Sequence, residues 1–187
     1  MTKKVKNNYI DNKRFYDTIC EYKQKVREAA EAGKEKPEIP YYAANAIRLI
    51  AENMAKRYHK FSRYSYNDEM VGDAILNCIK YFDNFDETRF KNPHAYFTKI
   101  CLQSNVLRIK IEHKNQYVKY KSFVNDSQLS GDPDIVFHDK HNLSKEEVYD
   151  NISTFISDYE RKENERKRIR KEKSDEKKLK DSLERYL

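Results

Sequence analysis

Glycine and proline, the residues that most often interrupt helices, are scarce in this chain of 187 residues. The sequence contains only three glycines and four prolines. Within a helix, glycine costs about 1 kcal/mol and proline about 3 kcal/mol relative to alanine, so their scarcity leaves long stretches free to be helical. We therefore expect an all-α protein, and its length allows one domain of ordinary size with appendages.

Capping residues and apolar periodicity predict two helices in the first 60 residues. The first should run from about Asp11, which can cap it, to Ala32, just before Gly33. A linker containing two prolines, residues 34–40, separates it from a second helix over residues 41–59. Apolar side chains repeat at helical spacing in both helices, at Phe15, Ile19, Tyr22 and Val26 and at Ile47, Ile50, Met54 and Tyr58. These two stripes can bury a core.

Two further helices complete a predicted compact bundle. The third should start after Ser65, where Ser65 and Asp68 have capping-box spacing, and should continue to about Asp83. Its apolar stripe consists of Met70, Ala74, Ile75, Ile79 and Phe82. In the fourth helix, Asn92 is the expected cap and Pro93 occupies the first helical position.

The fourth helix interleaves aromatic side chains with basic and amide side chains. Its cations are Lys99, Arg108, Lys110, Lys114, Lys119 and Lys121, and its aromatic residues are Tyr96, Phe97, Tyr117, Tyr120 and Phe123. Cations neutralise phosphates without reading sequence, whereas each ring can stack on an unpaired base for about 1–3 kcal/mol. This pattern predicts a surface for single-stranded or melted DNA. The alternative is that the rings form core and the cations a solvated face, and we assign Ile100, Leu107 and Ile111 to the core stripe.

The sequence changes character beyond Phe123. Residues 125–134 are rich in turn formers and predict a loop that ends the compact domain. A capping box of Ser144 and Glu147 then opens a further helix. Its apolar stripe consists of Val148, Ile152, Phe155, Ile156 and Tyr159. Residues 160–180 are almost all charged and predict either an exposed helix or a disordered tether.

Large apolar side chains return at the C-terminal tip. They are Leu183, Tyr186 and Leu187. Because the charged segment before them offers no core to join, they predict either a peptide that docks in a partner's groove or a frayed helix end.

Composition favours an anionic partner and a reducing compartment. The formal net charge is +7 and the sequence pI is about 9.1. The longest apolar runs fall short of the roughly 20 residues that span a bilayer, so we expect no membrane association and a cytoplasmic location. Cys20, Cys78 and Cys101 are odd in number and far apart, which predicts buried packing without disulfides.

Nothing in the sequence predicts catalysis. His138, Asp139 and His141, with Asp134 nearby, lack the spacing of a four-ligand zinc site. Cys101 has no evident activating neighbour, and no glycine-rich phosphate loop occurs. We therefore expect no metal, no cofactor and no enzymatic activity.

The order of these features resembles conserved region 2 of bacterial sigma factors of the sigma-70 class. In that region, a helix with an acidic and amide face precedes a D-x-F turn and then an aromatic and basic helix. Residues 84–96 (NFDETRFKNPHAY) and 103–114 resemble, more closely, the small late-transcription sigma factors of T-even type bacteriophages. The resemblance covers residues 45–124 and, more loosely, the C-terminal tip.

This resemblance implies two sets of binding residues. One set would bind the clamp helices of the largest subunit of host RNA polymerase core, through Asp68, Glu69, Asp73, Asn77 and Lys80. The other would recognise a minus-ten-like element of late promoter DNA and stabilise its melted strand, through Tyr96, Phe97, Lys99, Gln103, Asn105, Arg108, Lys110 and Lys114. Primary sigma factors usually carry tryptophans at the DNA fork, and this chain, which has no tryptophan, offers Tyr96 and Phe97 instead.

Besides the missing tryptophan, the chain differs from primary sigma factors in the region after Gly131, where no helix-turn-helix is recognisable. The module that reads the minus-thirty-five element is therefore missing. In the T-even family a C-terminal peptide attaches to the phage DNA sliding clamp, and Leu183, Tyr186 and Leu187 resemble it. A phage late co-activator is a further implied partner.

These inferences together predict four segments. They are an N-terminal helix and linker (1–40), a region 2-like core that binds polymerase and promoter (41–124), a loop and accessory helix (125–159), and a charged tether with the clamp-binding peptide (160–187). The expected function is that of a phage sigma factor acting in the host cytoplasm. The alternative is a nonspecific single-stranded nucleic-acid-binding protein that does not associate with polymerase, and it gives Glu69 and Asp73 no role.

Overall fold

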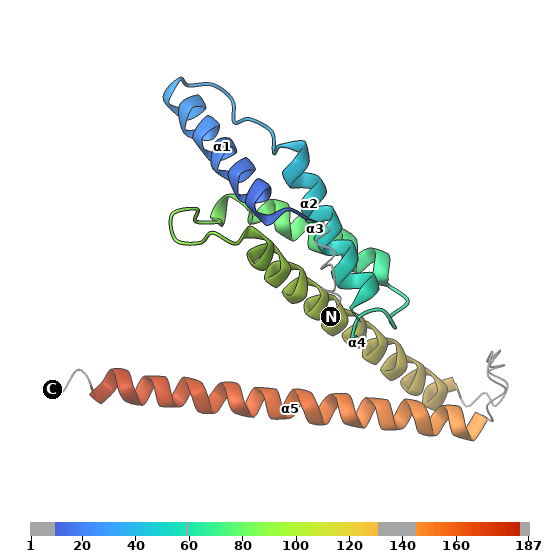
Figure 1. Cartoon of the computed structure of the whole chain (residues 1–187). Helices are drawn as coiled ribbons and strands as arrows, with labels where there is room; N and C mark the ends of the chain where they lie inside the picture. The colour runs from blue at the N-terminus through green and yellow to red at the C-terminus, as the bar shows by residue number, and fades with distance from the viewer. Residues whose placement is uncertain (1–9, 59, 131–144, 184–187) are drawn as a thin grey trace, which may run out of the picture. The chain divides into compact units, whose positions relative to one another are not determined.

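The structure of the chain is a computed structural model that describes residues 10–58, 60–130 and 145–183 (Figure 1). All regular elements within these residues are helical, and none of them is a strand. The expected all-α class is therefore confirmed. The chain divides into two compact units, residues 1–111 and 112–187, and the boundary falls inside helix α4.

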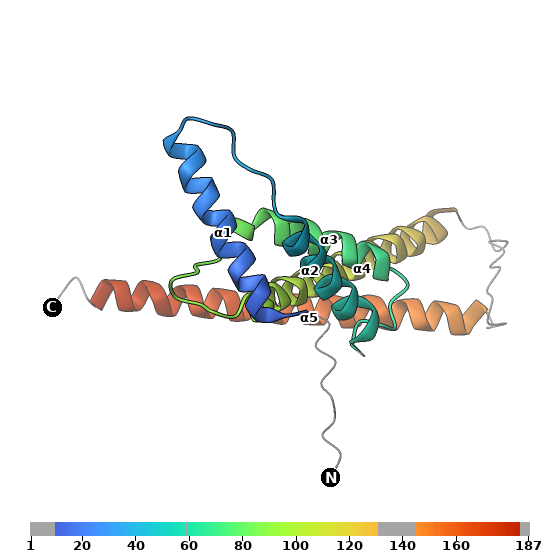
Figure 2. The same ribbon diagram turned by 45° about the horizontal axis from the view of Figure 1, so that its top comes forward.

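Helix α1, Asn12–Glu31, begins and ends where the sequence predicts. The side chain of Asp11 accepts hydrogen bonds from the backbone N–H groups of Lys13 at 2.9 Å and Arg14 at 3.2 Å. Gly33 follows the helix with φ of +61°, a left-handed conformation that costs glycine least. The linker then leads to α2, which packs against α1 (Figure 2).

Helix α2, Tyr41–Glu52, does not continue as an α-helix to residue 59 as predicted. A π-helical turn, η1, takes over at Asn53–Arg57. Each hydrogen-bonded ring of a π turn holds one more residue than that of an α turn, and such turns occur often at functional sites. Ala55 within η1 is fully buried, in a small cluster with Phe61 and Met70.

Helix α3, Asn67–Lys80, lacks the predicted capping box. Tyr66 stands at the cap position and its side chain does not cap the helix, and Asp68 forms an ion pair with Lys56 at 2.9 Å. The α-helix ends three residues before Asp83, and a short 3₁₀ turn, η2, follows at Phe82–Asn84.

Helix α4, Pro93–Ser130, starts with the predicted cap. The side-chain oxygen of Asn92 accepts the backbone N–H of Ala95 at 3.0 Å. The helix continues through residues 125–130, where we predicted the loop to begin, so that boundary is wrong. Residues 131–134 of the predicted loop lie outside the described residues, and so do His138, Asp139, His141 and the capping residue Ser144.

The centre of the first unit is a cluster of phenylalanine rings around Phe97. Its ring stacks at 5.5 Å from Phe15 of α1 and at 5.6 Å from Phe82, and it lies 6.5 Å from Phe85. All four rings are at most 1% exposed. Helix α1 therefore shares one core with α2, α3 and α4.

The face of α4 that enters this core differs from the predicted stripe. Leu107 is 54% exposed and Ile111 is 42% exposed, and Ile100 is only partly buried. The buried face instead carries Pro93, Phe97, Cys101, Ser104 and Asn105. Because this face includes two polar residues, apolar periodicity selected the wrong side of the helix. In α3, Ile79 is likewise 47% exposed, so it does not belong to the core stripe.

Two cysteines of the first unit are buried, as expected. The Sγ atoms of Cys78 and Cys101 lie 3.6 Å apart between α3 and α4. Their mutual hydrogen bond and their burial raise the pKa of the Cys78 thiol. Cys20 is only partly buried.

The second unit pairs the end of α4 with α5, Lys145–Leu183. Ile152 and Ile156 of α5 are buried. The rings of Tyr117, Tyr120 and Phe123, which we predicted as base-stacking faces, lie instead against rings of α5. The pairs are Tyr117 with Tyr159 at 4.5 Å, Tyr120 with Phe155 at 5.3 Å, and Phe123 with Tyr149 at 5.9 Å.

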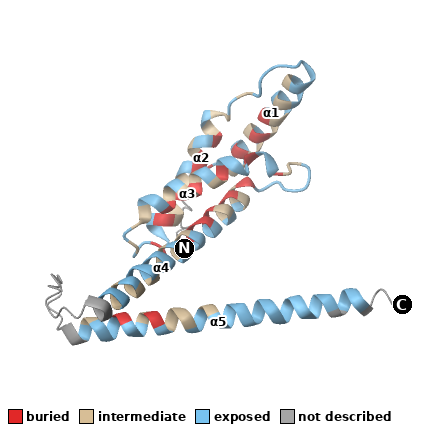
Figure 3. Ribbon diagram, turned by 180° about the vertical axis from the view of Figure 1, so that it is seen from behind, coloured by how far each residue is buried: buried red, intermediate tan, exposed pale blue. Residues whose placement is uncertain are grey.

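The charged residues beyond Glu160 continue α5 as a helix. This resolves the two open alternatives in favour of an exposed helix, because nearly all described side chains beyond residue 160 are exposed (Figure 3). Across the described residues, each helix is either too short or too polar to cross a membrane.

Replacing Phe97 with alanine should cost about 3–5 kcal/mol of unfolding free energy, because the change leaves a cavity among three packed rings. Urea denaturation measures this loss. The exposed neighbour Lys99, replaced with alanine, is the matched control and should stay within about 0.5 kcal/mol of the wild type. A loss below about 1 kcal/mol for Phe97→Ala would contradict the assignment of this ring to the core.

Candidate nucleic-acid interface

Five of the eight residues predicted to contact DNA share one outward face of α4. Tyr96, Lys99, Gln103, Lys110 and Lys114 follow one another at intervals of three, four, seven and four residues, so they lie along one side of the helix. Lys99, Gln103, Lys110 and Lys114 are exposed, and Tyr96 is half-buried. Leu107 completes the spacing between Gln103 and Lys110. We call Tyr96, Lys99, Gln103, Leu107 and Lys110 the outward stripe, since Lys114 belongs to the second unit.

The other three predicted DNA contacts point inward, and we withdraw them from the DNA-binding set. Phe97 is fully buried among Phe15, Phe82 and Phe85, so neither face of its ring is free for a base. Asn105 is fully buried as well. Arg108 forms an ion pair with Asp73 of α3, with Nε 2.6 Å from the carboxylate oxygen. These residues join α4 to the rest of the unit.

Asn105 is an unusual member of the core. Neither its amide nitrogen nor its amide oxygen has a hydrogen-bond partner among the described residues. A buried polar group without a partner costs about 1–3 kcal/mol. The structure therefore places a destabilising side chain where the resemblance implied a contact with promoter DNA.

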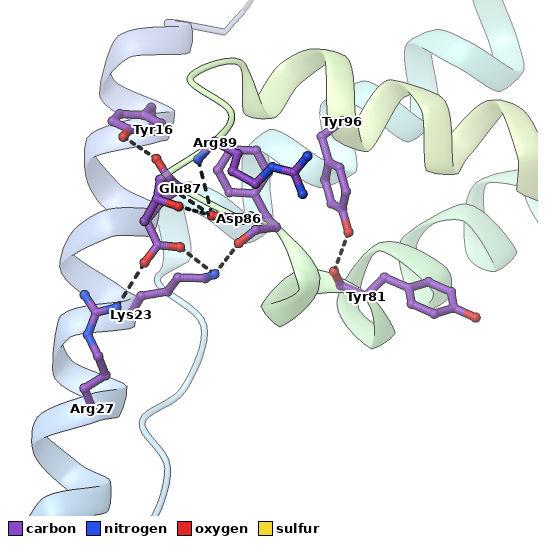
Figure 4. A network of polar contacts seen from close by, with 10 residues as sticks. Tyr16, Lys23, Arg27, Tyr81, Asp86, Glu87, Arg89 and Tyr96 are labelled. Atoms are coloured by element: carbon purple, nitrogen blue, oxygen red, sulfur yellow. Dashed lines mark hydrogen bonds and ion pairs between the residues drawn. The ribbon is translucent and has the colours of Figure 1, made fainter.

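Tyr96 is the one aromatic side chain of the outward stripe, and the turn before α4 positions it. Its hydroxyl donates to the backbone oxygen of Tyr81 at 3.0 Å (Figure 4). Its ring lies edge-on to Phe85 at 5.3 Å and to Phe97 at 5.1 Å. Burial raises the pKa of the Tyr96 hydroxyl, so this group stays neutral and able to donate. Phe97 thus supports the one ring of the outward stripe, which stays partly exposed.

The turn at residues 85–89 is held against α1 by Glu87. Its carboxylate bonds Lys23 at 2.7 Å and Arg27 at 3.0 Å, while its backbone oxygen accepts the Tyr16 hydroxyl at 2.9 Å (Figure 4). Lys23 also donates to the backbone oxygen of Phe85. Burial alone would raise the pKa of Glu87, but the bonds from Lys23 and Arg27 outweigh it, and the pKa lies below its ordinary value.

The residues predicted to bind polymerase lie on α3, and they differ in exposure and in their contacts with other residues of the fold. Asp68, Glu69 and Lys80 are exposed. Asp73 is engaged by Arg108, and the amide of Asn77 donates to the hydroxyl of Ser104 of α4 at 3.0 Å. The last two therefore connect α3 to α4, and Asp68 is paired with Lys56, which leaves Glu69 and Lys80 available to a partner.

Sequence periodicity missed two apolar residues on this exposed face of α3. Leu76 is 67% exposed and Ile79 is 47% exposed. Both lie on the same side of α3 as Lys80, and Gly72 and Glu69 lie on that side one and two turns earlier. The sequence does indicate that Leu76 is exposed. Ala74 and Cys78 are four residues apart and share the buried side of the helix, so Leu76, two residues from each, lies on the opposite side. We call Glu69, Leu76, Ile79 and Lys80 the α3 face.

The predicted clamp-binding residues are almost entirely beyond the described part of the chain. Tyr186 and Leu187 lie outside it, and Leu183 is the last residue of α5.

No protein-family model matches the chain, and no curated protein matches it either.

Replacing Glu87 with glutamine should destabilise the first unit by about 1–3 kcal/mol at pH 7, because charged hydrogen bonds to Lys23 and Arg27 are weakened. A carboxyl whose pKa is lowered by folding stabilises the protein above its unfolded pKa of about 4.3, and this contribution disappears as pH falls through the folded pKa. The difference between variant and wild type should therefore shrink between about pH 5 and pH 3, as followed by thermal melting. A constant difference over that range would contradict the role of the charge.

Proposed function

We propose that this chain is a phage-encoded promoter-specificity subunit. In this proposal it joins host RNA polymerase core through the α3 face and holds the melted strand of a late, minus-ten-like promoter element through the outward stripe. The chemistry of RNA synthesis then belongs to the polymerase. The sequence resemblance to region 2 of sigma factors motivates the proposal, and it would place the chain in the cytoplasm of the host bacterium.

The observation that carries the proposal is that two adjoining helices present exposed faces of different chemistry. The outward stripe of α4 offers cations, one amide and one half-buried ring, which suit phosphates and unpaired bases. The α3 face offers exposed apolar side chains beside an acidic and a basic residue, a mixture typical of protein interfaces. The pair Arg108–Asp73 and the hydrogen bond Asn77–Ser104 join the two helices, so docking of one face would place the other.

The α3 face also favours this function over a nonspecific single-strand binder. Exposed Glu69 repels phosphates, and exposed Leu76 and Ile79 contribute nothing to phosphate contacts. A protein that only bound single strands would have no use for this face. A promoter-specificity subunit needs it to bind the polymerase.

The C-terminal part of the proposal rests on sequence alone. Leu183, Tyr186 and Leu187 would attach the chain to the phage sliding clamp and so raise its effective concentration at the promoter, with a late co-activator as a further partner. Transcription with the clamp loaded tests this part, since unchanged stimulation after removal of residues 183–187 would refute it.

Variants of the two faces should separate the two binding steps. Leu76→Asp should reduce capture of bacterial core polymerase about 30-fold or more, because it places a charge in the apolar part of the α3 face. Tyr96→Leu should leave capture unchanged and reduce open-complex formation on an A·T-rich promoter about 10-fold, because the stacking ring is lost. Pull-down with core polymerase and permanganate footprinting measure the two steps.

Tyr96→Phe is the matched control for the ring, since it removes the bond to Tyr81 and keeps the stacking face. It should retain most open-complex formation. If neither the wild type nor any variant captures polymerase, the proposed function is refuted. If Tyr96→Leu loses capture and open-complex formation equally, the fold is damaged and the result does not report on a DNA contact.

A further inference from the structure

Residues 56–66 are a strongly basic segment that runs from the last two residues of η1 to the start of α3, and the proposed function does not use them. We call it the 56–66 segment. It contains four lysines and arginines, and no acidic residue occurs between Asn53 and Asn67. Lys56 is paired with Asp68 at 2.9 Å. The remaining cations, Arg57, Lys60 and Arg63, are exposed, and none of them forms an ion pair with any residue that the structure describes.

A buried anchor and turn hydrogen bonds hold the described residues of this segment. Phe61 is 3% exposed and packs against Ala55 and Met70. The N–H of Phe61 donates to the oxygen of Tyr58 at 2.9 Å, and the N–H of Tyr64 donates to the oxygen of Phe61 at 3.1 Å. Lys60 and Arg63 therefore flank a buried anchor and Arg57 belongs to η1, so less conformational entropy is lost when a ligand binds them.

The aromatic rings of the segment are used within the fold. Tyr64 and Tyr66 lie ring against ring at 5.1 Å, and Tyr58 and Phe61 lie at 5.4 Å. Tyr64 and Tyr66 also pack on the cluster that contains Phe61. The segment thus offers cations with few open ring faces, whereas the outward stripe carries Tyr96. This chemistry suits phosphates of a duplex better than unpaired bases, because bases in a duplex expose no faces.

The segment adjoins the end of the outward stripe within the first unit. Ile109 of α4 packs against the same cluster as Phe61, and the next residue, Lys110, belongs to the outward stripe. DNA held along the stripe would therefore reach the 56–66 segment at the Lys110 end.

We propose that Arg57, Lys60 and Arg63 bind the phosphate backbone of duplex DNA next to the melted element. This proposal rests on the proposed function, because the outward stripe supplies the melted strand. The contact is independent of sequence, and its contribution is electrostatic and therefore falls with added salt.

Salt-dependent binding of the full chain to two DNA probes tests this proposal. One probe is a fork with a 20-base-pair duplex arm and an A·T-rich single strand, and the other is the single strand alone. Replacing Arg57, Lys60 and Arg63 together with glutamine should reduce the slope of log affinity against log salt by about 2.7 on the fork, since each lost phosphate contact contributes about 0.9. The slope on the single strand should not change.

The matched control replaces Lys13, Lys25 and Lys34 with glutamine. These exposed lysines of α1 and of the turn after it form no ion pair with described residues, so the control removes the same net charge elsewhere. It should change the fork slope by less than about 1. Thermal melting verifies that both triple variants are folded.

Three outcomes would overturn the proposal. The first is an equal salt slope for the two triple variants on the fork. The second is an equal reduction of the slope on the single strand, which would assign the segment to unpaired DNA. The third is absence of fork binding by the wild type. Polymerase capture is measured separately and involves none of these cations. Loss of polymerase capture would therefore refute the proposed function, whereas an unchanged salt slope on the fork would refute the present proposal.

Discussion

The rest of the first unit depends on the burial of one ring, Phe97, between Phe15, Phe82 and Phe85. These four rings come from α1, from η2, from the turn after it and from α4, and together they join segments more than 80 residues apart in sequence. A buried phenylalanine contributes several kcal/mol, a large fraction of the stability of a small domain. With Phe97 fixed inside, the rotation of α4 about its axis is fixed as well.

That rotation decides which residues of α4 can meet a ligand. It turns Asn105 and Arg108 inward with Phe97 and leaves Tyr96, Lys99, Gln103 and Lys110 outside. Adjacent residues therefore have opposite roles: Phe97 builds the core, and Tyr96 keeps a partly open ring that the core supports. The same contacts between α3 and α4 connect the proposed DNA surface with the proposed polymerase surface, so the two surfaces are coupled by geometry.

Local signals predicted much of the helical layout, and long-range packing decided the rest. Asp11, Gly33 and Asn92 act on their own neighbours, and all three cap or end helices as expected. The rotation of α4 could not be predicted in this way, because its buried face includes the polar residues Ser104 and Asn105 and its exposed side includes Leu107 and Ile111. Likewise, the sequence around Arg108 does not reveal that its guanidinium pairs with Asp73, because that partner lies 35 residues away in the chain.

The central claim is that one side of α4, defined by Gln103, faces the melted strand while the adjacent side does not. A photo-crosslinking amino acid in place of Gln103 or of exposed Leu102 measures this directly, in a complex of the full chain with core polymerase and an A·T-rich promoter. The account predicts crosslinks to the non-template strand of the melted element from position 103 and none from position 102. Crosslinks from position 102 without any from position 103 would contradict it.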